Sequence, residues 1–308
     1  MLLAASLTGC GSNPVEDAAA APIPEAPSPT QATQSKDPTI TADSDPTSDD
    51  GTEAPGDELS SEDAVPDEAA AEPVPVCRPT VIFLDPGHGG NLRPTAATAG
   101  GSLGIYSGLT ASGGNEDQQV FDIAVGVAEI LRSAGFEVVL GRTENPSINP
   151  VPLWQVGLLA ETARDGEPAD LAVSIHTDVR AHVGNGEIYH QCVGCWRENN
   201  DGSVRRYFEN EVTAAASEQF ARVFAEVREE FTDAPIRVTA GHTFSPGRNL
   251  GSHGTIPIVM LSGQGVPWVF NEFPRTTDAG LSAEDLQLAI NSLAQATMRA
   301  LPPQLCNG

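Results

Sequence analysis

The stretch Val81–Gly90, VIFLDPGHGG, decides the fold that the sequence predicts. Its first four residues are apolar and rich in β-forming types, and the Pro and Gly that follow are typical of a strand that ends abruptly. His88 would then stand at the carboxyl end of a central strand, the edge where sites form in open α/β sheets. Taken alone, His88 also fits a simple turn, so the residues downstream decide between the two interpretations.

Alternating strand and helix patterns follow this stretch. Apolar residues at helical spacing predict helices over Glu116–Ser133, Leu153–Arg164, Glu209–Phe231 and Ser282–Leu301, and short apolar runs predict strands over Phe136–Leu140, Leu171–Ile175, Gly186–Gln191 and Pro267–Asn271. The Gly-, Ser- and Thr-rich stretch 91–114 predicts a long loop over the site. The alternation predicts an α/β class, in one domain with a mostly parallel twisted sheet and helices on both faces.

Composition divides the chain into four parts. We expect a signal-like segment over 1–10, an acidic linker over 11–77, the folded domain over 78–303 and a short tail over 304–308. Between Gly11 and Val76 there are 16 acidic residues, one lysine, 11 prolines and no aromatic residue. Such a stretch buries too little apolar surface to offset its chain entropy, so we expect it to be a disordered Pro-rich linker.

The amino terminus has the pattern of an export signal. Met1–Leu7 is apolar, and the following Thr-Gly-Cys ends at Cys10. The pattern resembles a bacterial lipoprotein signal, whose cysteine is lipidated and would anchor the protein to the membrane. The alternative is an ordinary secretory signal with an incidental cysteine. The segment is too short to span a bilayer, and both interpretations predict a protein outside the cytoplasm.

The net charge argues against nucleic acid as a partner. The chain has 42 acidic and 16 basic residues, with a formal charge of −26 at pH 7. Binding to nucleic acid requires Lys and Arg that neutralise phosphates. The sequence therefore predicts no nucleic-acid binding.

Four groups with metal and acid–base chemistry fall near predicted strand ends. His88, His176 and Glu272 each follow a predicted strand, and Glu116 begins the first predicted helix. The carboxyl ends of parallel strands meet at one edge of a sheet, so these groups can converge. Two imidazoles and a carboxylate form a catalytic zinc set, and a further carboxylate can accept a proton from water. Glu116 would also simply suit the positive end of its helix.

Two motifs carry a family resemblance. The segment DPGHGG at 85–90 and the tripeptide SIH at 174–176 occur in this order, each at a predicted strand end. They resemble motifs of the zinc-dependent N-acetylmuramoyl-L-alanine amidases, a family often called amidase 3. The resemblance covers about residues 80–301, which is nearly the whole predicted domain.

The resemblance implies a role for each of the four groups. It makes His88, Glu116 and His176 the ligands of one Zn²⁺ ion. The catalytic glutamate of the family, at the end of a late strand, falls on Glu272. Here the tripeptide FPR at 273–275 follows this glutamate, where the family usually has a small residue. This departure leaves open the alternative that Glu272 is a surface carboxylate.

The resemblance also implies a function. It predicts an exported peptidoglycan hydrolase that cleaves the amide between N-acetylmuramic acid and L-alanine. One alternative is a catalytically inactive module that binds the wall or regulates, which the altered sequence after Glu272 makes credible. The other is a zinc carboxypeptidase-like peptidase, which would require a glutamate three residues after His88, where Asn91 stands.

Four cysteines besides Cys10 predict disulfides in an exported chain. They allow three pairings. Cys77 and Cys306 flank the domain, so we expect them to pair, and we expect Cys192 to pair with Cys195. The larger loop would contribute about 5 kcal/mol in the chain-entropy model.

Overall fold

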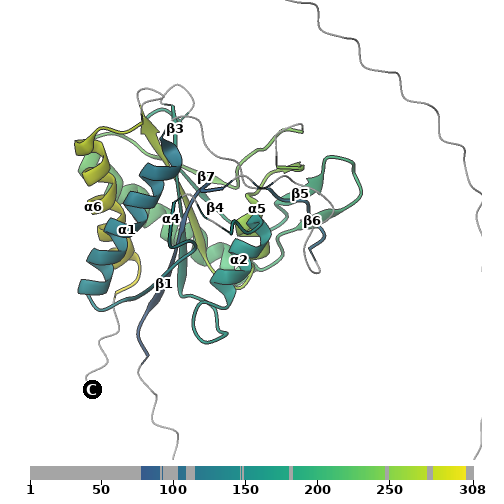
Figure 1. Cartoon of the computed structure of the whole chain (residues 1–308), viewed down its shortest axis with the longest axis horizontal. Coiled ribbons are helices and arrows are strands. Elements are labelled where there is room, and N and C mark those ends of the chain that lie inside the picture. Colours follow the sequence, from purple (N-terminus) through teal and green to yellow (C-terminus); the bar gives the residue numbers. More distant parts are fainter. Residues whose placement is uncertain are drawn as a thin grey trace, which may run out of the picture. The chain divides into compact units, whose positions relative to one another are not determined.

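A six-stranded sheet in the order β2-β1-β3-β9-β4-β7 forms the centre of the domain (Figure 1). Its strands are β1 (Val81–Pro86), β2 (Glu137–Leu140), β3 (Leu171–Val179), β4 (Glu187–His190), β7 (Arg237–Ala240) and β9 (Trp268–Arg275). All neighbouring pairs run parallel except β4 and β9, which are antiparallel. The predicted α/β fold with a mostly parallel sheet is confirmed.

This computed structural model describes residues 78–90, 92, 103–108, 115–145, 147, 149–179, 183–246, 250–275 and 280–302. All of them belong to one unit, Ala71–Gly308. The signal-like segment with Cys10, the acidic linker, the tail and most of the 91–114 loop lie outside the described residues. The expected pairing of Cys77 with Cys306 also lies outside them, so these expectations stay predictions.

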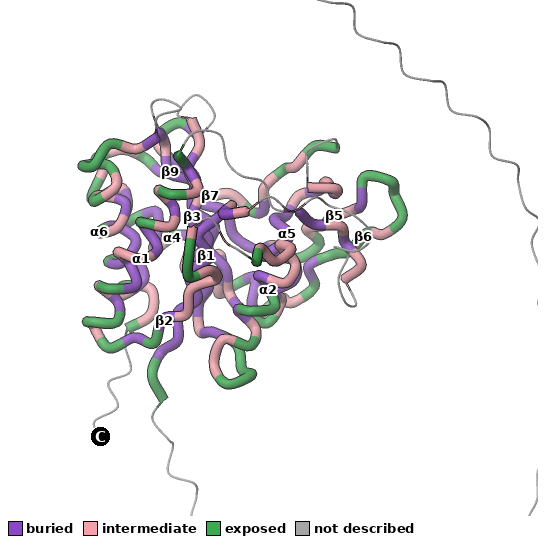
Figure 2. Tube along the Cα trace, viewed as in Figure 1, coloured by how far each residue is buried: buried purple, intermediate pink, exposed green. Residues whose placement is uncertain are grey.

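Alternate residues of the central strands pack into two hydrophobic cores, one on each face of the sheet. In β1, Ile82 and Leu84 join one core, while Val81 and Phe83 join the other. Successive side chains of a strand point to opposite faces, and both faces are covered here, so the strand is apolar throughout. Figure 2 shows the buried residues concentrated along the sheet.

Helices of different length cover the two faces. The first face, which carries Ile82 and Leu84, packs against α1 (Glu116–Ser133), α4 (Glu211–Thr232) and α6 (Ala283–Ala300). The second face, which carries Val81 and Phe83, packs against α2 (Leu153–Glu161) and α5 (Ile258–Ser262). No helix in the described part of the chain combines the length and the apolar character needed to cross a membrane. Because α2 and α5 have only nine and five residues, they cover the second face only in part.

Three predicted ends of elements lie three or more residues from the observed ends. Helix α2 ends at Glu161 instead of Arg164, since Arg164 pairs its backbone with that of Glu167 in a turn. Strands β3 and β9 run beyond the predicted ends, to Val179 and Arg275, because their parallel ladder continues to those residues. The two predicted site residues on these strands therefore lie within them.

A second, antiparallel sheet was not predicted. It consists of β5 (Trp196–Asn199), β6 (Arg205–Tyr207) and β8 (Ser252–Gly254), in the order β6-β5-β8. Its strands have three or four mostly polar residues, too few to show alternation of apolar and polar positions. A disulfide between Cys192 and Cys195 lies just before β5.

Candidate metal centre

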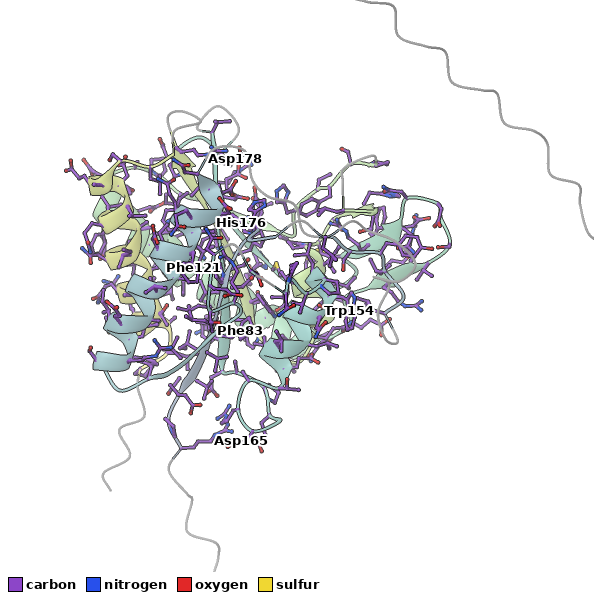
Figure 3. All side chains as sticks on the ribbon, viewed as in Figure 1. Phe83, Phe121, Trp154, Asp165, His176 and Asp178 are labelled. Carbon is purple, nitrogen blue, oxygen red and sulfur yellow. A yellow bond between two sulfur atoms is a disulfide. The ribbon has the colours of Figure 1, made fainter. Side chains whose placement is uncertain are left out.

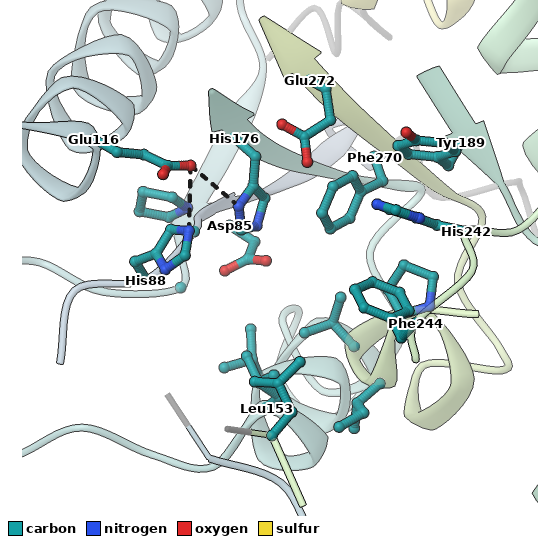
Figure 4. Close-up of a pocket in the computed structure, with 18 of the residues that line it drawn as sticks. Asp85, His88, Glu116, Leu153, His176, Tyr189, His242, Phe244, Phe270 and Glu272 are labelled. Carbon is teal, nitrogen blue, oxygen red and sulfur yellow. Dashed lines mark ion pairs between the residues drawn. The ribbon is translucent and has the colours of Figure 1, made fainter. Parts of the chain in front are cut away.

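A cavity of about 1400 Å³ opens on the second face, near the carboxyl ends of β1 and β3. The period of two that directs Val81 and Phe83 to this face also directs Asp85 to it. His176 and Glu272 line the same cavity (Figure 4). Figure 3 shows His176 and Asp178 at one end of the sheet and the turn with Asp165 at the other. The site thus occupies the sheet edge expected from the sequence.

His88, Glu116 and His176 come together at one side of the cavity. One ligand atom from each lies within 4.8 Å of the other two, so this group could hold a metal ion. Glu116 Oε1 lies 3.2 Å from His88 Nε2 and 3.7 Å from His176 Nδ1 (Figure 4). The chain thus unites residues separated by 88 positions through the turn after β1, the start of α1 and the strand β3.

The turn after β1 has the backbone geometry that this convergence requires. His88 has a φ of 61°, in the left-handed region that side chains rarely adopt, and Gly89 follows with a φ of 86°. A Cβ at Gly87 would overlap the imidazole of His176. Gly87 thus permits the close approach of His176 to this turn, and Gly89 permits the positive φ that follows His88.

Glu116 is held as a carboxylate by several donors. The backbone N–H of Thr177 donates to Glu116 Oε1 at 3.0 Å, and Arg275 Nη2 lies 3.9 Å from Glu116 Oε2. Burial raises the pKa of Glu116, but hydrogen bonds from His176 and His88, together with their charges, outweigh burial and leave the pKa well below its usual range. The side chain is therefore more than a residue that complements a helix end.

Glu272 lies beside this group and is protonated more readily. It is directly paired with His176 across the ladder of β3 and β9 and is only 8% exposed. Burial, with the nearby charges of Glu116 and Asp178, raises the pKa of Glu272 well above its ordinary value. Its Oε2 atom is buried and has no hydrogen-bond partner among the described residues. The alternative of a surface carboxylate is therefore wrong.

An aromatic wall continues the cavity away from His176. Phe270 stacks on His176 with ring centroids 4.5 Å apart, and His242 lies between Tyr189 and Phe244 at 4.2 Å and 4.4 Å (Figure 4). No motif in the sequence marks this wall. The period of two would have indicated Phe270, since it is two residues before Glu272 on the same strand.

Arg142, which no motif marks either, ties together the two segments that carry His88 and Glu116. Its guanidinium donates to the carbonyl oxygens of Pro86 at 3.1 Å and Gly87 at 3.3 Å, and to that of Asp117 at 2.8 Å. Pro86 and Gly87 directly precede His88, and Asp117 directly follows Glu116. Arg142 therefore sets the distance between two of the three donors.

We expect Arg142→Lys to weaken metal binding by about 10–100-fold, as is typical when a group that orients ligands is lost. Lysine keeps the charge but lacks the planar fork that reaches several carbonyls at once. The measurement is zinc affinity by competition with a chromophoric chelator. Arg132→Lys is the matched control, because Arg132 donates to the Val138 carbonyl outside the cavity. Equal affinities of the two variants would contradict this role.

The fold and the site together define an α/β protein with a candidate metal centre at the carboxyl edge of its sheet. The sequence matches the family model described as N-acetylmuramoyl-L-alanine amidase (Amidase_3) over residues 82–261. The chain belongs to this family. No curated protein matches the chain.

Several solved structures resemble the chain. Ami1 of Mycobacterium smegmatis, an N-acetylmuramyl-L-alanine amidase, is 16% identical with a TM-score of 0.49, covering 72% of this chain and 96% of that chain. The amidase AmiC2 of Nostoc punctiforme is 19% identical with a TM-score of 0.42, covering 71% and 96%. The catalytic domain of the amidase CwlV from Bacillus (Paenibacillus) polymyxa is 21% identical with a TM-score of 0.40, covering 71% and 97%. The family assignment rests on the family match.

Proposed function

We propose that the protein is a zinc-dependent hydrolase of peptidoglycan that cleaves the amide between N-acetylmuramic acid and L-alanine. Membership in the amidase family supports the substrate. The observation that carries the chemistry is the convergence of His88, Glu116 and His176 beside the buried carboxyl group of Glu272. The sequence left open an inactive module as the alternative, and digestion of purified sacculi distinguishes this module from an active enzyme.

The donor set fits zinc. Two imidazoles and one carboxylate are the ligands of many catalytic zinc sites, which keep a further position open for water or substrate. The lowered pKa of Glu116 keeps this ligand ionised at neutral pH. A bound zinc ion would supply Lewis acidity, polarising the scissile carbonyl and lowering the pKa of water.

Glu272 would move the proton of the reaction. Its carboxylate accepts a proton from the attacking water as the oxygen bonds to the carbonyl carbon, and it returns this proton to the nitrogen when the C–N bond breaks. Glu272 lines the cavity beside the candidate metal ligands, which is the position that this transfer requires. Burial raises the pKa of Glu272 above its ordinary value, which makes its carboxylate a stronger base toward the attacking water.

The experiment is digestion of purified peptidoglycan sacculi with the purified protein. We expect release of stem peptides with free amino-terminal L-alanine and no new reducing sugar ends. A chelator should reduce release to background, and added zinc should restore it. New reducing ends without new amino termini would contradict amide cleavage, and tight binding without release would instead support the inactive module.

Export and membrane attachment belong to the same proposal. Peptidoglycan lies outside the cytoplasm, and the signal-like segment ending at Cys10 would bring the enzyme there. If Cys10 is lipidated, the acidic linker would act as a tether between the membrane and the domain. Incorporation of labelled fatty acid into the wild-type chain and its absence from Cys10→Ala would support the anchor.

A further inference from the structure

The row of the sheet that carries Glu272 leads on to an arginine. Register pairs join His176 to Glu272, Glu272 to Glu187, and Glu187 to Arg237 across β3, β9, β4 and β7. Directly paired residues of neighbouring strands share one face of a sheet. All four side chains line the cavity. With neighbouring strands about 4.8 Å apart, the backbone of Arg237 lies roughly 10 Å from that of Glu272.

Arg237 is the cation of the cavity that a ligand can reach. Within the described residues, three arginines line the cavity, Arg142, Arg197 and Arg237. Arg142 is engaged by backbone carbonyls, and Arg197 is fully buried, stacked on a phenylalanine ring and bonded to the Ile256 carbonyl. The side chain of Arg237, by contrast, is 66% exposed. No lysine occurs in the described part of the chain.

A buried carboxylate holds Arg237 in place. Glu187, whose side chain is only 6% exposed, forms an ion pair with Arg237 Nη2 and accepts a hydrogen bond from the hydroxyl of Tyr189. This ion pair engages one end of the guanidinium, which has five N–H donors in a rigid plane. Glu187 therefore orients the guanidinium of Arg237, while the exposed part of the arginine side chain faces the cavity.

We propose that Arg237 binds a carboxylate on the second or third residue of the leaving peptide, counted from the scissile nitrogen, so that the substrate class is an acidic muramoyl peptide. This inference rests on the proposed function. An extended peptide advances about 3.3–3.6 Å per residue, so roughly 10 Å corresponds to about three residues. Because the Arg237 side chain lines the cavity, it can reach a carboxylate on the second or on the third residue of the peptide.

A carboxylate is favoured over a carboxamide for a chemical reason. A guanidinium can donate two parallel hydrogen bonds to the two oxygens of a carboxylate, and both bonds are strengthened by charge. A carboxamide offers a single neutral acceptor oxygen. The difference between a charged and a neutral hydrogen bond corresponds to a preference of about tenfold.

The kinetic test compares two N-acetylmuramoyl tripeptides that differ only in the side groups of residues two and three, free carboxylates in one and carboxamides in the other. We expect the wild type to prefer the acid by about tenfold in kcat/KM, mainly through KM. Arg237→Gln should abolish this preference, and Arg237→Lys should retain part of it. Arg205→Gln is the matched control, since Arg205 is also a strand arginine paired with a glutamate, Glu198, but lies outside the cavity.

A binding test separates this proposal from the proposed function. The free acidic and amidated peptides are titrated into the metal-free protein and its variants by calorimetry. If the wild type binds the acidic peptide more tightly than the amidated one, and Arg237→Gln removes this difference, the Arg237 site is supported even without turnover. Absence of turnover in that case would contradict only the proposed hydrolase activity. Turnover or binding with no difference between acid and amide, or a difference that survives in Arg237→Gln, would overturn the Arg237 site and leave the hydrolase standing.

Discussion

Glu272→Gln is expected to lower kcat by about 10²–10⁴-fold, the usual contribution of general acid–base catalysis. Glutamine keeps the size of the side chain but can neither accept nor return the proton. Since Glu272 is not in the group of donors that could hold the metal, the variant should bind zinc as tightly as the wild type. The measurements are release of amino-terminal L-alanine and metal content of the same preparation.

The matched control is Glu198→Gln, on β5, outside the residues that line the cavity. It should leave both turnover and zinc content at the wild-type level. Turnover by Glu272→Gln at the rate of Glu198→Gln would remove Glu272 from the mechanism. Loss of zinc together with turnover would instead make Glu272 part of the metal centre.

The same substitution has an expected effect on stability with a defined sign. Because the pKa of Glu272 is raised in the folded protein, ionising it costs folding free energy, and the metal-free wild type loses stability as the pH rises above the ordinary value of 4.5. Glutamine does not titrate. We therefore expect metal-free Glu272→Gln to melt at a higher temperature than the wild type at alkaline pH, with the difference shrinking toward pH 4.5.

The second large effect is expected for His176→Ala. Removing one of three protein ligands should weaken zinc binding by more than about 100-fold, because loss of a mere orienting partner already costs 10–100-fold. Release of stem peptides should fall to background at limiting zinc. Unlike Glu272→Gln, this variant should lose turnover and metal together.

His253→Ala is the control for a lost imidazole. His253 lies on β8 in the second sheet and is not part of the group that could hold the metal. The control should bind one zinc ion with wild-type affinity, measured by competition with a chromophoric chelator. Wild-type affinity in His176→Ala as well would place the metal elsewhere and remove the proposed centre.

Much of the fold could be predicted because local patterns agree with the tertiary structure. Helix α1 begins and ends at the predicted residues, since its buried positions recur at helical spacing and Glu116 marks its first turn. The strands β3 and β9 were found, but their ends were not. Their length depends on pairing between the two strands, whose first pair joins Ala172 to Trp268, 96 positions later in the sequence. Neither strand alone contains a local pattern that shows how far this pairing extends.

The candidate site divides in the same way. The motif residues His88 and His176 stand out because glycines and a strand end surround them. Arg142, Glu187 and Arg237 carry no motif, and an isolated arginine or glutamate in a sequence is most often a surface residue. Their importance arises from sheet register and from carbonyl groups that the folded backbone presents to them.

The sequence by itself determined the helices α1, α2, α4 and α6, five of the six strands of the central sheet, the family, and the residue types that could hold a metal. Hydrophobic periodicity and short motifs are local properties, so they can be read from the chain directly. Only the tertiary structure decided that Glu272 is buried, that a row of side chains runs from His176 to Arg237, and that Arg142 joins two donor segments. Burial and proximity between distant residues are created by packing, and no single stretch of the chain contains them.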